Sequence, residues 1–110
     1  MTVRDYLGEF EHIVLLAVLR LGEQAYGVTV RREIAERTGR DASIGAIYAT
    51  LDRLQRKGYV TSRFADPTPE RGGRSKRYFR VTAEGASAIQ RTRQALSAMA
   101  EGLKPLARHS

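Results

Sequence analysis

The stretch SIGAIYATLDRLQRKG, residues 43–58, predicts a helix with one buried face. Its apolar side chains recur at the spacing of a helix, at Ile44, Ile47, Tyr48, Leu51 and Leu54. Ser43 is a good N-cap, and Gly58 is able to adopt the left-handed conformation that ends a helix. The opposite, solvent-facing side is predicted to consist of Ala46, Ala49, Thr50 and Arg53.

A β-hairpin is predicted to follow this helix. The segments 59–64 (YVTSRF) and 75–82 (SKRYFRVT) alternate between apolar and polar residues, as half-buried strands do. The apolar side chains expected to point inward are Val60, Phe64, Phe79 and Val81. Between the strands, residues 65–74 hold two prolines and the pair Gly72-Gly73, which suits a turn. The chain is therefore expected to carry a wing beside the helix.

Positive charge is concentrated in this helix and hairpin. Between Asp52 and Arg80 there are nine Lys or Arg and three acidic residues, a balance of +6 out of the net +7 of the whole chain. The isoelectric point near 10.4 suits a polyanionic partner. A half-buried helix that runs into a basic hairpin is able to place one element in the major groove of DNA and another along the phosphates.

Two more helices are predicted before residue 43. The run 9–21 (EFEHIVLLAVLRL) has acidic residues in its first turn and Gly22 at its end. A second helix, 28–39, opens after Tyr26-Gly27 and ends at Gly39. Its inward side chains are expected to be Val28, Val30 or Arg31, Ile34 and Ala35. Two helices joined by a short turn form a helix-turn-helix, whose second helix reads DNA.

A last helix is expected to begin after the hairpin, with Thr82 as its N-cap. It carries a heptad-like stripe of Ile89, Thr92, Leu96, Met99, Leu103 and Leu106. A helix with an apolar stripe of only about two heptads is too short to be stable by itself in water. The run 13–19 of the first helix is apolar all round and needs cover as well. We therefore expect a homodimer in which each last helix packs against the partner's first helix.

The length and the composition of the chain restrict the class of protein. A chain of 110 residues is one domain, with a winged helix-turn-helix part at residues 1–82 and a C-terminal dimerisation helix and tail at residues 83–110. The chain has no cysteine, which fits a reducing compartment. The longest apolar run, 13–19, is too short to span a bilayer and lacks a basic lead-in, so we expect a cytoplasmic protein. The predicted fold class is mainly α with a small β-hairpin.

No residue pattern points to catalysis or to a cofactor. His12 and His109 are isolated from each other, and no acidic residues stand at metal-ligand spacing beside them. The chain has no phosphate-binding GxxxxGK[ST] loop, and no serine has an identifiable base. We therefore predict a protein without enzymatic activity, metal or cofactor, whose partners are double-stranded DNA and a second copy of itself.

Four segments together resemble the PadR-like transcriptional regulators: LGEFEHIVLLAVLRL, AYGV, SIGAIYATLDRLQRKGYV and PERGGRSKRYFRVTAEG. The resemblance covers residues 7–103. It implies a winged-helix homodimer that binds a two-fold operator, usually as a repressor, and releases it on binding a small-molecule effector. Short members that sense flat aromatic drugs use aromatic side chains on the final helix, whereas this chain has no aromatic residue after Phe79.

The resemblance also assigns roles by position. It makes residues 43–57 the recognition helix and residues 71–77 the wing. Within these, Thr50 and Arg53 are predicted to read bases, and Arg71 and Arg74 to enter a minor groove or clamp its phosphates. The full predicted DNA-binding set is Ser43, Gly45, Ala46, Tyr48, Ala49, Thr50, Arg53, Arg71, Gly72, Gly73, Arg74, Lys76 and Arg77. The predicted dimer interface is Phe10, Ile13, Val14, Ala17, Ile89, Leu96, Met99 and Leu103.

Two interpretations stay open at the level of sequence. Tyr48 lies on the apolar face, so it either packs in the core or reaches a phosphate with its hydroxyl. Gly45 is expected to let the backbone approach DNA. The chain as a whole is either an operator-binding regulator or a basic winged-helix module that binds RNA or serves as a scaffold. The dimer stripe favours the regulator, because a two-fold operator needs a symmetric partner.

Overall fold

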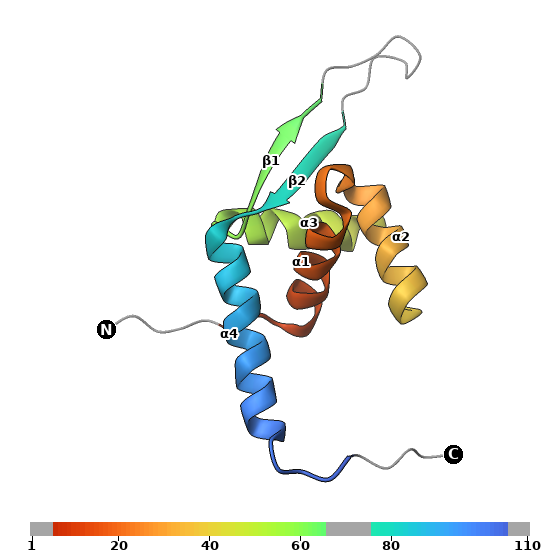
Figure 1. The fold of residues 1–110 in the computed structure, drawn as a ribbon. Coiled ribbons are helices and arrows are strands. Elements are labelled where there is room, and N and C mark those ends of the chain that lie inside the picture. Colours follow the sequence, from red (N-terminus) through yellow and green to blue (C-terminus); the bar gives the residue numbers. More distant parts are fainter. Residues whose placement is uncertain (1–5, 66–75, 106–110) are drawn as a thin grey trace.

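The computed structural model describes residues 6–65 and 76–105, which form a group of helices with a two-stranded hairpin (Figure 1). The elements in chain order are α1 Glu9–Leu21, the short 3-10 helix η1 Gly22–Gln24, α2 Gly27–Thr38, α3 Ile44–Arg56, β1 Val60–Phe64, β2 Arg77–Val81 and α4 Ala83–Ala100. The predicted fold class, a winged helix-turn-helix followed by a C-terminal helix, is confirmed. Among the described residues, no helix is both long and apolar enough to cross a membrane.

Hydroxyl side chains begin α3 and α4. Ser43 Oγ accepts a hydrogen bond from the Ala46 N–H at 3.0 Å, and Thr82 Oγ1 accepts one from the Gly85 N–H at 3.0 Å. Both predicted N-caps are therefore confirmed. Beyond the end of α3, Gly58 has a φ of 82°, a left-handed conformation that glycine adopts without steric cost.

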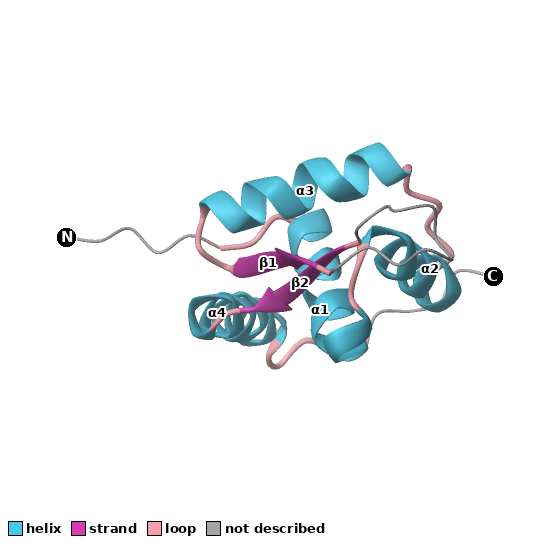
Figure 2. Cartoon of the chain, turned by 90° about the horizontal axis from the view of Figure 1, so that it is seen from above, coloured by secondary structure: helices cyan, strands magenta, loops and turns pink. Residues whose placement is uncertain are grey.

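The core lies where α1, α2 and α3 meet one face of the hairpin, as the view from above shows (Figure 2). The largest fully buried side chains are Leu15, Ile47, Leu51, Leu54, Val14, Val18, Val30 and Val60. Burial of each leucine or isoleucine contributes roughly 1.5–3 kcal/mol. The apolar face that the sequence predicts for α3 is thus what holds this helix on the body and leaves its other face outside.

Strand β2 has a partner on each of its two edges. It pairs antiparallel with β1, from Val60 opposite Val81 to Phe64 opposite Arg77. On its other edge, the Phe79 N–H donates to the Ala25 carbonyl at 2.9 Å, next to an isolated bridge between two tyrosines. The base of the hairpin is therefore tied to the connection between α1 and α2, so its orientation on the helices is fixed.

Four side chains that the sequence pattern placed inward are exposed: Val28, Ala35, Ile44 and Phe64. Helix α2 instead buries Gly27, Val30 and Ile34. Phe64 is the last residue of β1 and is 69% exposed. These four predictions are wrong, because apolar spacing alone shows neither how a short helix is rotated about its axis nor that residues at the end of an element, such as Ile44 and Phe64, are less covered than those in its middle.

Two glycines allow contacts that a larger residue would block. A methyl group at Gly27 would overlap the ring of Tyr48, and one at Gly85 would overlap the carbonyl oxygen of Tyr59. Helix α2 therefore starts directly against α3, and the first turn of α4 lies against the turn that precedes β1. From that anchor the first half of α4 packs against α1 and buries Ala88 and Ile89, and its second half extends beyond the other helices (Figure 1).

Candidate nucleic-acid interface

The outer face of α3 is a stripe at helical spacing, made of Gly45, Ala49, Asp52 and Arg56. It lies opposite the buried residues of the same helix. Gly45, Ala49 and Arg56 are exposed and Asp52 is half-buried. The predicted residues Ser43 and Ala46 are also exposed, beside this stripe. Arg56, which was not predicted to bind DNA, is thus the cation at the C-terminal end of this stripe.

Thr50 does not lie on the outer face, although the sequence analysis placed it there as a base reader. Its residue is only 3% exposed. The buried side of α3 is wider than the apolar residues alone indicate, because α1 and α2 both pack against this helix. The prediction that Thr50 faces solvent and reads bases is therefore wrong.

Arg53 lies at the flank of α3, where a buried carboxylate holds it. Arg53 Nε donates to Glu11 Oε2 at 2.9 Å, and Lys57 Nζ donates to the same oxygen at 3.0 Å. The other carboxylate oxygen of Glu11 accepts from the Gly8 N–H at 3.1 Å, at the start of α1. Glu11 therefore joins α1 to the C-terminal end of α3. The Arg53 side chain stays about half exposed, so it remains a candidate for DNA contact.

The environment of Glu11 keeps it ionised. Burial of the carboxyl acts to raise its pKa, but the hydrogen bonds from Lys57, Arg53 and Gly8 outweigh burial, and the pKa falls below its ordinary value of 4.5. Sequence reasoning missed this residue, because an acidic residue near a helix start is usually exposed and favourable to the helix dipole.

We expect Glu11→Gln to lower the free energy of unfolding by about 2 kcal/mol at neutral pH, because two cations lose a buried counter-charge. The lowered pKa means that this stabilisation is present above pH 4.5 and disappears as the pH falls through the folded-state pKa. Urea unfolding at several pH values measures both effects. The control is Glu9→Gln, whose carboxylate forms an exposed ion pair with Arg40 and should change stability little. Equal losses for the two variants, or a difference that persists far below pH 4.5, would contradict the assignment.

Tyr48 packs inside the domain. Its ring lies against Gly27, and its centroid is 6.4 Å from that of Phe79. The residue is half-buried, so both of the roles considered for it, core packing and a phosphate contact from the rim, remain compatible with its position. The ring contacts establish the packing role.

Lys76 and Arg77, the described cations of residues 71–77, are engaged within the chain. Lys76 Nζ donates to the Tyr26 hydroxyl at 3.1 Å, and lies 4.2 Å from the centroid of that ring. Arg77 Nη1 donates to Asp52 Oδ1 at 2.8 Å, and its Nη2 donates to Gln55 Oε1 at 2.8 Å. These bonds fasten the hairpin to α2 and α3. The other predicted wing residues, Arg71, Gly72, Gly73 and Arg74, lie outside the described residues.

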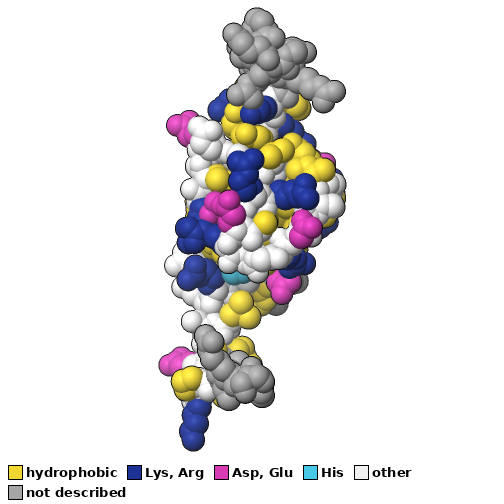
Figure 3. All heavy atoms as spheres, turned by 90° about the vertical axis from the view of Figure 1, so that its right-hand side faces the viewer, with side chains coloured by type: hydrophobic (Ala, Val, Ile, Leu, Met, Phe, Trp, Pro, Cys, Tyr) yellow, Lys and Arg dark blue, Asp and Glu magenta, His cyan; other side chains and the backbone are white. Residues whose placement is uncertain are grey.

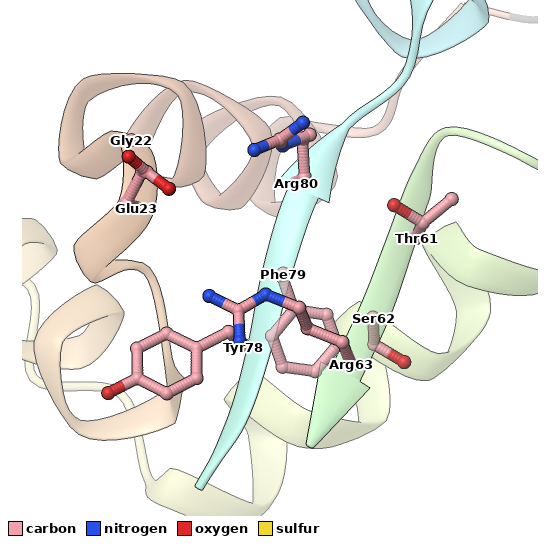
Figure 4. A pocket seen from close by; sticks show the side chains of 8 residues that line it. All are labelled: Gly22, Glu23, Thr61, Ser62, Arg63, Tyr78, Phe79 and Arg80. Atoms are coloured by element: carbon pink, nitrogen blue, oxygen red, sulfur yellow. The ribbon is translucent and has the colours of Figure 1, made fainter. Parts of the chain in front are cut away.

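A hollow of about 220 Å³ lies between η1 and the hairpin (Figure 4). The guanidinium carbon of Arg63 is 5.0 Å from the centroid of the Tyr78 ring on one side of it. Arg80 and Glu23 lie toward its other end (Figure 4). Arg63 and Arg80 point to the opposite face of the hairpin from Arg77, because successive residues of a strand alternate. Both faces of the hairpin therefore carry positively charged side chains. Sequence reasoning missed this hollow, because its two sides are remote in the chain.

The side of the molecule at the right of Figure 1 has a mixed surface. Basic side chains are interspersed there with acidic and apolar ones rather than gathered in a stripe (Figure 3). In the sequence, residues 52–80 hold +6 of the +7 net charge, so the positive and negative charges of the remaining residues nearly balance.

The predicted dimer residues fall into two groups. Val14, Ala17 and Ile89 are buried within the chain's own core, so they have no surface left for a partner and their assignment is wrong. Phe10 and Ile13 are half-buried against the core. The exposed fractions of Leu96 and Met99, in the last turns of α4, are 62% and 80%, and that of Leu103, beyond the end of this helix at Ala100, is 66%. Of the predicted dimer residues, only the exposed Leu96, Met99 and Leu103 and the half-buried Phe10 and Ile13 are therefore available to a second subunit.

His12 lies on α1 near α4 and is half-buried. Burial lowers its pKa, and the positive charge of Arg93 lowers it further. The neutral form is therefore favoured at neutral pH. Within residues 6–65 and 76–105, no group of three or more His, Cys, Asp or Glu side chains is arranged to hold a metal ion.

Comparison with known proteins gives a family and a fold. The chain matches the model of the transcriptional regulator PadR-like family over residues 15–91. No match was found among the curated proteins. A transcriptional regulator from Clostridium thermocellum is similar in structure, with 20% identity, a TM-score of 0.69, and coverage of 86% of this chain and 92% of the other. A PadR-like transcriptional regulator from Bacillus cereus has 19% identity, a TM-score of 0.66, and coverage of 83% and 84%. A winged-helix DNA-binding protein from STIV has 18% identity, a TM-score of 0.67, and coverage of 89% and 98%. These three structures show the shared fold.

Proposed function

Because the chain belongs to the PadR-like family of transcriptional regulators, we propose that it binds double-stranded DNA as a homodimer and represses transcription from a two-fold operator. One observation supports this most: the exposed stripe of α3 lies beside a hairpin that Arg77 fastens to the same helix. In winged helix-turn-helix proteins the recognition helix enters the major groove. Here Ser43, Gly45, Ala46, Ala49, Arg53 and Arg56 are the candidates on α3 for contact with DNA.

The homodimer is supported by the apolar end of α4. Leu96 and Met99 are exposed in the last turns of α4, and Leu103 follows shortly after the helix ends at Ala100. A group of exposed apolar side chains indicates an interaction surface. In a two-fold arrangement, Leu96, Met99 and Leu103 of each subunit would cover Phe10 and Ile13 at the start of the partner's α1. We propose the same interface as the binding site of a small-molecule effector, because a pocket for it would form where α1 and α4 left a gap between the subunits.

The proposal is tested by selection of bound fragments from sheared genomic DNA. The purified protein should enrich a small set of sequences with two-fold symmetry. A labelled duplex from that set should be displaced by the unlabelled duplex and not by RNA of equal length. Displacement by RNA with equal efficiency would favour the alternative, a basic winged-helix module that binds RNA.

Binding should depend strongly on salt. If each subunit contacts about four phosphates, log K plotted against log salt should have a slope near −7 for the dimer. Replacing both Arg71 and Arg74 with alanine should weaken binding to every sequence and make the slope shallower, because the wing contacts phosphates. Fluorescence anisotropy at several salt concentrations measures the slope. The matched control is the pair Arg20→Ala and Lys104→Ala, which removes the same charge outside α3 and the hairpin. An unchanged slope for the wing variant, or an equal change in the control, would remove the wing from the interface.

A further inference from the structure

Asp52 is the one acidic residue in α3, Ile44–Arg56. It stands on the outer stripe of this helix, between Ala49 and Arg56, and its side chain is 45% exposed. A negative charge at this place opposes the approach of DNA phosphates. If this carboxylate faces DNA in spite of the repulsion, we expect it to accept a hydrogen bond from a specific donor group of a base.

The carboxylate is held in position from the wing. Arg77 Nη1 donates to Asp52 Oδ1 at 2.8 Å, and the Arg77 side chain is only 24% exposed. Arg77 is itself fixed by three further contacts, with Gln55 Oε1 at 2.8 Å, Ser62 Oγ at 3.3 Å and the Phe79 ring, whose centroid is 4.8 Å from its guanidinium carbon. Strands β1 and β2 run beside α3, which places Arg77 within reach of this helix (Figure 2). The side chain of Asp52 is therefore preorganised, with one oxygen paired to Arg77.

An ionised carboxylate only accepts hydrogen bonds. In the major groove, the donors are the N4 amino group of cytosine and the N6 amino group of adenine, while guanine O6 and N7 and thymine O4 are acceptors that repel it. Adenine also presents the acceptor N7 next to its amino group, whereas cytosine has no acceptor on that edge. Cytosine is therefore the better partner.

We propose that Asp52 is a specificity-determining residue that accepts a hydrogen bond from the amino group of a cytosine at one position in each half of the operator, and that Arg77 is the residue that positions it. This inference rests on the proposed function, because it requires α3 to lie in the major groove. Its simplest rival is that Asp52 serves only to fasten the wing. Without Asp52, Arg77 keeps Gln55 of α3 as a partner, and Ser62 of β1 donates to the same Gln55 Oε1 at 2.9 Å, so the hairpin has other attachments to α3.

The test is selection from a library of random DNA duplexes, followed by sequencing, with the wild type and two variants. Asp52→Asn keeps the shape of the side chain and removes its charge. Gln55→Ala removes a different partner of the same Arg77 and leaves the carboxylate in place. The wild type should prefer cytosine at one position per half-site. In Asp52→Asn this preference should be about tenfold weaker, while the base preferences at the other positions stay unchanged. Gln55→Ala should keep it.

A second measurement separates base reading from charge. Removal of an acidic residue should make Asp52→Asn bind random duplex DNA slightly more tightly, while its affinity for the selected duplex falls. Arg77→Gln should weaken the cytosine preference at that same position. Thermal melting checks that each variant is folded.

Three outcomes would overturn the inference. The first is an unchanged base profile in Asp52→Asn, and the second is the same loss of preference in Gln55→Ala. The third is a wild type that binds duplex DNA without a preference for cytosine, which leaves the proposed function intact. A wild type that retains no duplex at all would instead overturn the proposed function together with this inference.

Discussion

Gly85→Ala is expected to lower the free energy of unfolding by about 3 kcal/mol or more. A methyl group there would overlap the Tyr59 carbonyl oxygen, which belongs to the backbone and has little freedom to move. That carbonyl also accepts a hydrogen bond from the Thr82 N–H at 3.0 Å, so a shift of α4 would break a second contact at the start of the helix. Urea unfolding followed by circular dichroism measures the loss.

The control is the same substitution at Gly45. This glycine lies in the first turn of α3, and a methyl group there would meet only the Ser43 hydroxyl at 4.0 Å. Alanine is a better helix former than glycine by about 0.5–1 kcal/mol, so Gly45→Ala should be neutral or slightly stabilising. If Gly85→Ala were as stable as Gly45→Ala, the first turn of α4 would not lie against the turn before β1.

Leu96→Glu is expected to weaken dimerisation at least a hundredfold, on the proposal that α4 covers the partner's α1. Each interface loses one leucine and gains one buried charge per subunit, and each leucine contributes about 1.5–3 kcal/mol. The folded monomer should be little affected, because Leu96 is 62% exposed in the single chain. Light scattering at micromolar concentration should show a dimer for the wild type and a monomer for Leu96→Glu.

Gln94→Glu provides the control for this substitution. It adds the same charge to an exposed position of the same helix, away from the stripe of Leu96, Met99 and Leu103. It should remain a dimer. A monomeric wild type, or two variants that dissociate equally, would remove the stripe from any interface.

The features that could be predicted from sequence are those that repeat along the chain. The spacing of Ile47, Leu51 and Leu54 gave the buried face of α3, and Ser43 and Thr82 gave the starts of two helices, because each of these signals is local. The alternation on either side of residues 66–75 gave both strands, with their ends shifted by at most two residues.

The features that sequence did not reveal depend on contacts between distant residues. Thr50 is buried because α1 and α2 both pack on α3, which no local pattern in residues 43–58 shows. Glu11 meets Arg53 across 42 positions of the chain, and Asp52 meets Arg77 across 25. Arg56 was within reach of a sequence argument, since it continues the spacing of Gly45 and Ala49 along the helix.

The pairing of β2 on both edges also bears on how the protein behaves at high concentration. An open strand edge is a template for joining other chains, and folded proteins keep such edges short, charged or covered. Here β1 covers one edge of β2, and the Ala25–Tyr26 segment occupies part of the other. Within the described residues, the outer edge of β1 belongs to a strand of five residues that includes Arg63. The hairpin is thus protected against edge-to-edge aggregation, although it projects from the rest of the molecule.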